Sequence, residues 1–191
     1  MAAVGSTMLP LGTAAPDFAL EDPHGRTWRL DDYAGSPALL VAFICNHCPY
    51  VKHIRRALAE VTERYQRAGV SVVGINSNAA THPDDSVEAM RTEVAEAGYT
   101  FPYLVDSDQV AARAYRAACT PDFFLFDADR ALVYRGQFDS SRPGGDAPAD
   151  GSDLAAAVEA VLAGRPVPGE QRPSIGCNIK WIPGNEPDWH G

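Results

Sequence analysis

The stretch ALLVAFICNHC, residues 38–48, decides the fold that we expect for this chain. Its first seven residues form an uninterrupted apolar run, which is typical of a central strand covered on both faces. The next apolar residues follow one another at intervals of three and four: Val51, Ile54, Leu58, Val61 and Tyr65. That spacing marks one face of a helix. The two cysteines of the stretch therefore lie where a buried strand meets an amphipathic helix.

Cys45 is the residue that this junction is expected to make reactive. The N-terminus of a helix offers unpaired N–H groups and a partial positive charge, and the pKa of a thiol placed there can fall to roughly 3.5–7.5. Cys48 lies about one helical turn further on and can reach the Cys45 sulfur. We expect Cys45 to attack a substrate disulfide and Cys48 to resolve the mixed disulfide. His47, between them, would favour the thiolate through its partial positive charge.

The same Cys-x-x-Cys pattern also occurs as half of a zinc site. Zinc usually needs two more ligands with a local spacing of their own, and Cys119 and Cys177 both stand singly. A protein that binds Cu(I) or zinc through the two motif cysteines and either His47 or His53 stays an alternative, because thiolates suit both ions. The motif beside a βαβ pattern is more typical of redox work. We therefore expect no cofactor and no resident metal.

The rest of the chain alternates between strand-like and helix-like patterns. We predict strands at residues 17–20, 26–30, 38–44, 70–76, 101–105, 123–127 and 131–136. We predict helices at residues 49–68, 84–97, 108–118 and 152–163, with Val87, Met90 and Val94 as the inner face of the second. Residues 140–151 are rich in Gly, Pro and Asp, which indicates a loop. This order predicts a central mixed sheet with helices on both faces.

The length of 191 residues suits one domain with a sizeable core. We expect a single domain over residues 1–191, in which residues 15–163 form the core. The Pro- and Gly-rich tail, residues 164–191, is expected to have no regular structure.

The formal charge of −9 argues against nucleic acid and anionic membranes as partners, since both are polyanions. The first 16 residues contain no Lys or Arg and no long apolar run, and no part of the chain approaches the ~18 apolar residues that span a bilayer. We therefore expect a cytoplasmic location.

These features resemble the thioredoxin superfamily over residues 15–163. The resemblance rests on the strand at residues 38–44, the Cys-Asn-His-Cys segment that opens a helix, and Thr120-Pro121 before a later strand. It implies an α/β thioredoxin-like fold, with a central mixed sheet flanked by helices and an N-terminal β-hairpin extension. It also implies that Pro121 is a cis proline that faces the cysteine pair, with Thr120 beside it.

Within that superfamily, the opening Ala-Pro-Asp-Phe at residues 15–18 is similar to the peroxiredoxin branch, the alkyl hydroperoxide reductase and thiol-specific antioxidant proteins. The segment CNHCPYVKH, residues 45–53, and the segment IGCNIKW, residues 175–181, look like a less-studied peroxiredoxin-like group. The resemblance implies the fold and says little about the substrate.

One departure from the family pattern concerns peroxide. True peroxiredoxins carry a Pro-x-x-x-Thr/Ser-x-x-Cys signature, and counting back from Cys45 the hydroxyl position holds Ala42 and the proline position Ala38. Counted from Cys48, the same positions hold Cys45 and Val41. Neither cysteine fits, which argues against efficient peroxide reduction.

A second departure concerns the proton of the resolving thiol. Thioredoxins keep a buried acid on the strand before the motif, and residues 38–44 contain none. His47 or His53 could take that role on proximity alone.

Cys119 and Cys177 are the two cysteines outside the motif. Cys119 directly precedes Thr120 and would face the site across the sheet, as a second redox partner, a metal ligand or a small core residue. Cys177 lies in the tail with Trp181 and Trp189, and such a tail must pack on something to stay ordered. Either the tail brings Cys177 toward Cys45, or its aromatic residues merely cover an apolar patch. We favour the second interpretation.

The sequence thus predicts an enzyme, a thiol-disulfide oxidoreductase with Cys45 and Cys48 as its redox pair. The alternative is a thiol-dependent peroxidase, in which a peroxide oxidises Cys45 to a sulfenic acid and Cys48 resolves it. A Cu- or Zn-binding protein is the third possibility. The expected partners are a protein or small-molecule disulfide or peroxide and a thiol reductant such as a thioredoxin-type donor, without nucleic acid or membrane.

Overall fold

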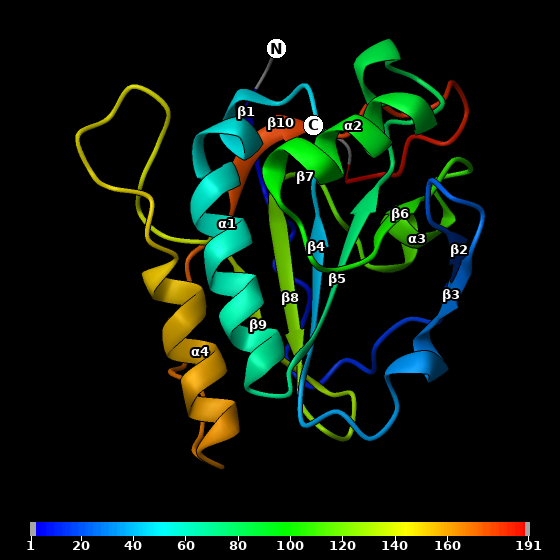
Figure 1. The fold of residues 1–191 in the computed structure, drawn as a ribbon. Helices are drawn as coiled ribbons and strands as arrows, with labels where there is room; N and C mark the ends of the chain where they lie inside the picture. The colour runs from blue at the N-terminus through cyan, green and yellow to red at the C-terminus, as the bar shows by residue number, and fades with distance from the viewer. Residues whose placement is uncertain (1–2, 190–191) are drawn as a thin grey trace.

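The apolar run at residues 38–44 forms β4 (Leu39–Phe43), the strand around which the molecule is built. The computed structural model describes residues 3–189 (Figure 1). β4 pairs in parallel with β5 (Ser71–Asn76) and antiparallel with β8 (Asp122–Phe126). All its residues are buried because its side chains alternate between two cores, Leu40 and Ala42 in one and Val41 and Phe43 in the other. The prediction of a doubly covered central strand is confirmed.

The complete sheet has seven strands in the order β3-β2-β6-β5-β4-β8-β9 and is mixed, as predicted. Its remaining strands are β2 (Ala19–Glu21), β3 (Thr27–Arg29), β6 (Tyr103–Val105) and β9 (Leu132–Gly136). β2 and β3 form the expected antiparallel hairpin, in which Leu20 faces Trp28.

Helices cover both faces of this sheet. α1 (Pro49–Arg67) buries the five apolar residues whose spacing predicted it, and it shares one core with α2 (Val87–Ala97) and α4 (Ser152–Leu162). The short α3 (Val110–Ala114) packs into the core on the other face. Burial of each large apolar side chain in these cores contributes about 1.5–3 kcal/mol. Figure 1 shows α1 and α4 side by side in front of the sheet.

Two helices differ from the prediction. The expected helix at residues 108–118 is reduced to α3. Its N-cap residue, Gln109, has a left-handed backbone conformation. α2 begins only at Val87, because Ser86 caps it by accepting a hydrogen bond from the N–H of Ala89 at 3.3 Å. Val87 is therefore on the first turn and is exposed, whereas Met90 is fully buried. The preceding residues, Pro83–Asp85, form a separate 3-10 turn.

The prediction that residues 164–191 have no regular structure is wrong. Ile175–Asn178 form β10, which pairs antiparallel with β1 (Ala3–Gly5) on one side and with β7 (Cys119–Thr120) on the other. A four-residue strand with distant partners has no periodicity of its own, so the local pattern did not reveal it. Among residues 3–189, no helix is both long and apolar enough to cross a membrane.

Candidate active site

The Cys-Asn-His-Cys segment lies between the end of β4 and the start of α1. Cys45 follows the strand by two residues, and Cys48 is the N-cap residue of the helix, with Pro49 as the first helical residue. Pro is well suited to that position because its missing N–H would be unpaired there in any case. Both cysteines are fully buried, and their side chains are hydrogen-bonded to each other.

Of the two motif cysteines, Cys48 is the one whose pKa is lowered. Its sulfur accepts hydrogen bonds from the thiols of Cys45 and Cys177 and from the N–H groups of Val51 and Cys177. These donors hold the pKa of Cys48 well below its ordinary value, although burial acts in the opposite direction. The carbonyl of Thr120, 3.1 Å from the Cys48 sulfur, favours the protonated thiol. The groups that lower the pKa of Cys48 prevail.

The expectation that Cys45 has a lowered pKa is therefore wrong. The hydrogen bond to Cys48, burial and the charge of Asp85 all raise the pKa of the Cys45 thiol. The physical reason is where the helix begins. Because α1 starts at Pro49, the free N–H of Val51 in its first turn meets the sulfur of Cys48.

Thr120 faces the cysteine pair, and Pro121 is the cis proline that the sequence resemblance implied. The Thr120-Pro121 peptide bond is cis. The hydroxyl of Thr120 lies 3.1 Å from the Cys45 sulfur, and its carbonyl lies at the same distance from the Cys48 sulfur. Thr120 thus contacts both thiols from the strand that precedes Pro121.

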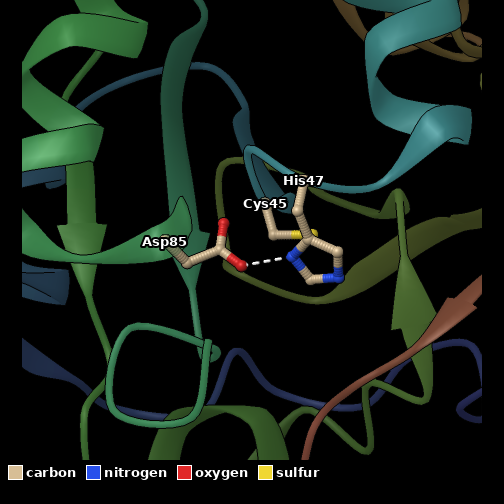
Figure 2. A group of neighbouring side chains, drawn as sticks. All are labelled: Cys45, His47 and Asp85. Carbon is tan, nitrogen blue, oxygen red and sulfur yellow. Dashed lines mark hydrogen bonds and ion pairs between the residues drawn. The ribbon is translucent and has the colours of Figure 1, made fainter. Parts of the chain in front are cut away.

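Asp85 is the buried negative charge of the site, and the sequence alone did not identify it as a site residue. It is fully buried, and its carboxylate accepts hydrogen bonds from the Asn46 N–H at 2.6 Å, the Asn76 amide at 3.2 Å and His47 Nδ1 (Figure 2). Burial alone would raise the pKa of Asp85, but the bonds from His47 and Asn46 hold it below the ordinary value. Asp85 therefore stays charged and orients His47.

The sequence did not point to His82 either, and its ring lies against the ring of His47. The His47 and His82 rings stack with their centroids 3.8 Å apart. His47 Nε2 is buried and has no hydrogen-bond partner among the described residues. A signal for Asp85 and His82 did exist: both follow β5, whose C-terminal end lies beside that of β4 because the strands are parallel. The helical pattern at residues 84–97 predicted instead that Asp85 lies in the first turn of a helix.

Cys45, His47 and Asp85 together offer a sulfur, a ring nitrogen and a carboxylate oxygen within 4.8 Å of one another. Such a set is able to hold a soft divalent ion such as zinc. His53, the other histidine considered, does not join this group, because its Nε2 is hydrogen-bonded to the Ser141 hydroxyl at 3.0 Å.

Cys177 lies at the cysteine pair, whereas Cys119 does not. Cys177 is 2% exposed, belongs to the same buried cluster as Cys45 and Cys48, and is hydrogen-bonded to Cys48. The favoured interpretation, that the tail merely covers an apolar patch, is therefore incomplete. Cys119 is buried with its sulfur 3.6 Å from the carbonyl of Pro121.

A hollow in the surface adjoins Pro121. It lies between the first turn of α1, the Pro121 segment and the loop after β9, and its lining includes Tyr50, His53, Pro121, Phe138, Arg142 and Ile175. Pro121 directly follows Thr120, the residue that contacts both thiols, so this hollow adjoins the site.

Comparison with known proteins identifies the family. Residues 11–135 match the AhpC/TSA family. The thiol-disulfide oxidoreductase ResA of Geobacillus thermodenitrificans is 31% identical over 121 residues, which cover 63% of this chain and 66% of that protein. The chain thus spans just under two thirds of that relative.

Two solved structures illustrate the fold. An uncharacterised conserved protein of Geobacillus kaustophilus superposes with a TM-score of 0.93 at 52% identity, over 96% of this chain and 98% of the other. A secreted disulfide oxidoreductase of Mycobacterium tuberculosis superposes with a TM-score of 0.59 at 22% identity, over 75% and 95% of the two chains. The expected thioredoxin-like fold is confirmed.

Proposed function

The chain belongs to the AhpC/TSA family, and on this basis we propose that it is a thiol-disulfide oxidoreductase that works through Cys45 and Cys48. The observation that carries the proposal is the contact between two buried sulfurs at the N-terminus of α1, both touched by Thr120. Two thiols so placed can close and reopen a disulfide, which is the basis of thiol-disulfide exchange.

The first step belongs to Cys48, since it holds the thiolate. Its sulfur attacks a substrate disulfide, a Cys48–substrate disulfide forms, and the other half of the substrate leaves as a thiolate that takes up a proton. Cys45 then attacks the Cys48 sulfur. The remaining substrate thiol is released, and the two electrons have passed from the cysteine pair to the substrate. A thiol donor of thioredoxin type would reopen the Cys45–Cys48 disulfide.

The second step needs a proton acceptor, because Cys45 starts as a thiol with a raised pKa. A ring nitrogen of His47 lies within 4.8 Å of the Cys45 sulfur, and Asp85 would stabilise the imidazolium that forms. His47 therefore takes the role that the sequence left between His47 and His53. Asp85 acts through His47 and is a positioning residue.

The Asp85→Asn variant tests this assignment. We expect the substitution to slow the resolving step about tenfold or more, because the imidazolium loses its anionic partner, while attack by Cys48 changes little. Stopped-flow measurement of the two steps against pH separates the effects. His53→Gln is the matched control, since His53 contacts Ser141 and not the thiols. An equal loss in both steps would point to a structural role for Asp85 instead.

The oxidoreductase itself is tested with oxidised glutathione as substrate. We expect the Cys45→Ser/Cys177→Ser variant to trap glutathione on Cys48, and the full chain to form the Cys45–Cys48 disulfide reversibly in glutathione buffers. Cys48→Ser should abolish both reactions, whereas Cys119→Ser should keep them. A reduced protein that forms neither the adduct nor the internal disulfide would refute the proposal.

A peroxidase is the second candidate, and the Thr120 hydroxyl beside Cys45 favours it, because a hydroxyl near the sulfur can polarise a peroxide. Arg55, the arginine nearest the motif in sequence, is paired instead with Glu93 and Glu96. We therefore expect hydrogen peroxide to oxidise the protein more slowly than a disulfide does. Faster consumption of hydrogen peroxide than of oxidised glutathione would reverse this order.

A further inference from the structure

The strand β10 lies directly on the segment that contacts the cysteine pair. Its Cys177 pairs with Thr120, and its Asn178 pairs with Cys119, in antiparallel register. Gly176 makes this approach close, because a Cβ atom at that position would lie 2.0 Å from the carbonyl oxygen of Thr120. The backbone of β10 is therefore held against Thr120, the residue that touches both Cys45 and Cys48.

This register places a third thiol against Cys48. The Cys48 sulfur is hydrogen-bonded to the side chain of Cys177 and to its backbone N–H, in addition to the side chain of Cys45. Cys48 is thus flanked by two thiols that come from distant parts of the chain. Cys119 precedes Thr120 on the same strand, and its sulfur is directed instead to the carbonyl of Pro121.

We propose that Cys177 is a third redox cysteine, which resolves disulfides on Cys48 in parallel with Cys45. This inference rests on the oxidoreductase function proposed above. In a Cys48–substrate disulfide, the Cys177 sulfur attacks the Cys48 sulfur. The bond between Cys48 and the substrate breaks, a Cys48–Cys177 disulfide forms, and the substrate thiolate takes up the proton that Cys177 loses. The electrons come from the Cys48 and Cys177 thiols.

The same attack can move an existing disulfide without any net oxidation. Starting from the Cys45–Cys48 disulfide, attack by Cys177 on Cys48 frees Cys45 as a thiol and leaves the disulfide on β10. Burial and the neighbouring Cys48 thiolate raise the pKa of Cys177 in the reduced protein, and Lys180 opposes them. Once Cys48 is in a disulfide it carries no charge, so one of the two obstacles to ionisation of Cys177 is removed.

The test compares single and double variants with oxidised glutathione as the probe. In Cys45→Ser, glutathione should attach to Cys48 and then be expelled as a Cys48–Cys177 disulfide forms, seen by peptide mass spectrometry after alkylation. In Cys45→Ser/Cys177→Ser, the adduct should persist at least about tenfold longer, because no neighbouring thiol can displace it. Cys45→Ser/Cys119→Ser is the matched control and should behave as the single variant does.

Each outcome decides between the two proposals. Equal lifetimes of the adduct in Cys45→Ser and Cys45→Ser/Cys177→Ser, without a Cys48–Cys177 disulfide, would overturn the role of Cys177 and leave the oxidoreductase intact. Failure of Cys48 to take up glutathione in every variant would overturn the oxidoreductase instead.

The unsubstituted protein gives a second measurement that needs no variant to fold. Graded oxidation followed by acid quenching should show both the Cys45–Cys48 and the Cys48–Cys177 disulfide, and the absence of the second would contradict the proposal.

Discussion

At the scale of single residues, the site depends on how hydrogen-bond donors are distributed between two adjacent sulfurs. Cys48 accepts hydrogen bonds from the N–H groups of Val51 and Cys177, whereas Cys45 is hydrogen-bonded to the Thr120 hydroxyl and lies near the carboxylate of Asp85. A thiolate gains from donors and loses from a nearby anion. The two cysteines of one motif are thereby made unequal, and the nucleophile that we propose is the second of them.

Because of this difference between the two thiols, we expect Cys48 to ionise at a lower pH than an ordinary cysteine. The reduced protein should gain thiolate absorbance at 240 nm with a midpoint below the ordinary ~8.5 of a thiol. Cys48→Ser should remove that transition and Cys119→Ser should keep it. The absorbance does not require a reagent to reach the buried sulfur, so burial cannot conceal the result. A low transition that survives in Cys48→Ser and vanishes in Cys45→Ser would assign the thiolate to Cys45.

The raised pKa of Asp122 leads us to expect that the stability of the protein depends on pH. It is fully buried directly after Pro121, and burial raises its pKa to about 8, above the ~3.9 of an unfolded chain. Between these values the folded state keeps a proton that the unfolded state has lost. The contribution of Asp122 is therefore most favourable below about pH 4 and is lost as the pH rises through 8.

Urea unfolding at several pH values measures this contribution. The free energy of unfolding of the unsubstituted protein, relative to Asp122→Asn, should fall between pH 4 and 8. The exposed Asp129→Asn variant, which lies in the turn after β8, serves as the control. A difference between the protein and Asp122→Asn that does not vary with pH would show that Asp122 has an ordinary pKa.

At the scale of elements, β10 is the part that completes the site. It supplies the Cys177 thiol and N–H to Cys48, and Gly176 allows it to lie close to Thr120. Gly176→Ala should therefore destabilise the protein by about 1–3 kcal/mol, as an overpacked substitution does. It should also raise the midpoint of the Cys48 thiolate transition, because β10 must move away.

Gly169→Ala is the matched control for this substitution, since a Cβ atom at Gly169 would meet nothing within 4 Å. Both changes add one methyl group to a glycine of the same C-terminal segment. An unchanged thiolate midpoint in Gly176→Ala, in a protein that has lost stability, would show that β10 supports the fold without tuning Cys48.

At the scale of the whole molecule, two cores share one sheet. Leu58 of α1 is fully buried in the first core, and Leu104 of β6 is fully buried in the second. Trp28 and Trp181 pack against the second core only. Because β4 contributes side chains to both cores, loss of either should unfold the other.

The prediction of a single domain can therefore be tested with two substitutions. Leu58→Ala and Leu104→Ala should each lower the free energy of unfolding by about 2–5 kcal/mol. In both variants, circular dichroism and tryptophan fluorescence should report the same unfolding midpoint. If Leu58→Ala shifts the dichroism and leaves the fluorescence transition in place, the two cores are separate folding units.

The sequence by itself determined the parts of this protein whose signals are local. The apolar run of β4, the helical spacing of α1 and the Cys-x-x-Cys motif between them lie within thirty residues, so periodicity and spacing were enough to predict the junction. The cis proline at Pro121 was also predicted from a local signal, because the resemblance to the family rests there on the short Thr120-Pro121 segment.

Only the tertiary structure decided which groups surround the sulfurs. The bond between His47 and Asp85 joins residues 38 positions apart, and Thr120 is 72 positions from Cys48. Cys177 reaches the site through a strand too short to have a pattern of its own. The pKa of each thiol is set by the other motif cysteine, by burial, and by contacts with Asp85, Thr120 or Cys177, which lie far away in the sequence. The motif alone therefore favoured Cys45 as the nucleophile, whereas the contacts in the fold led us to propose Cys48.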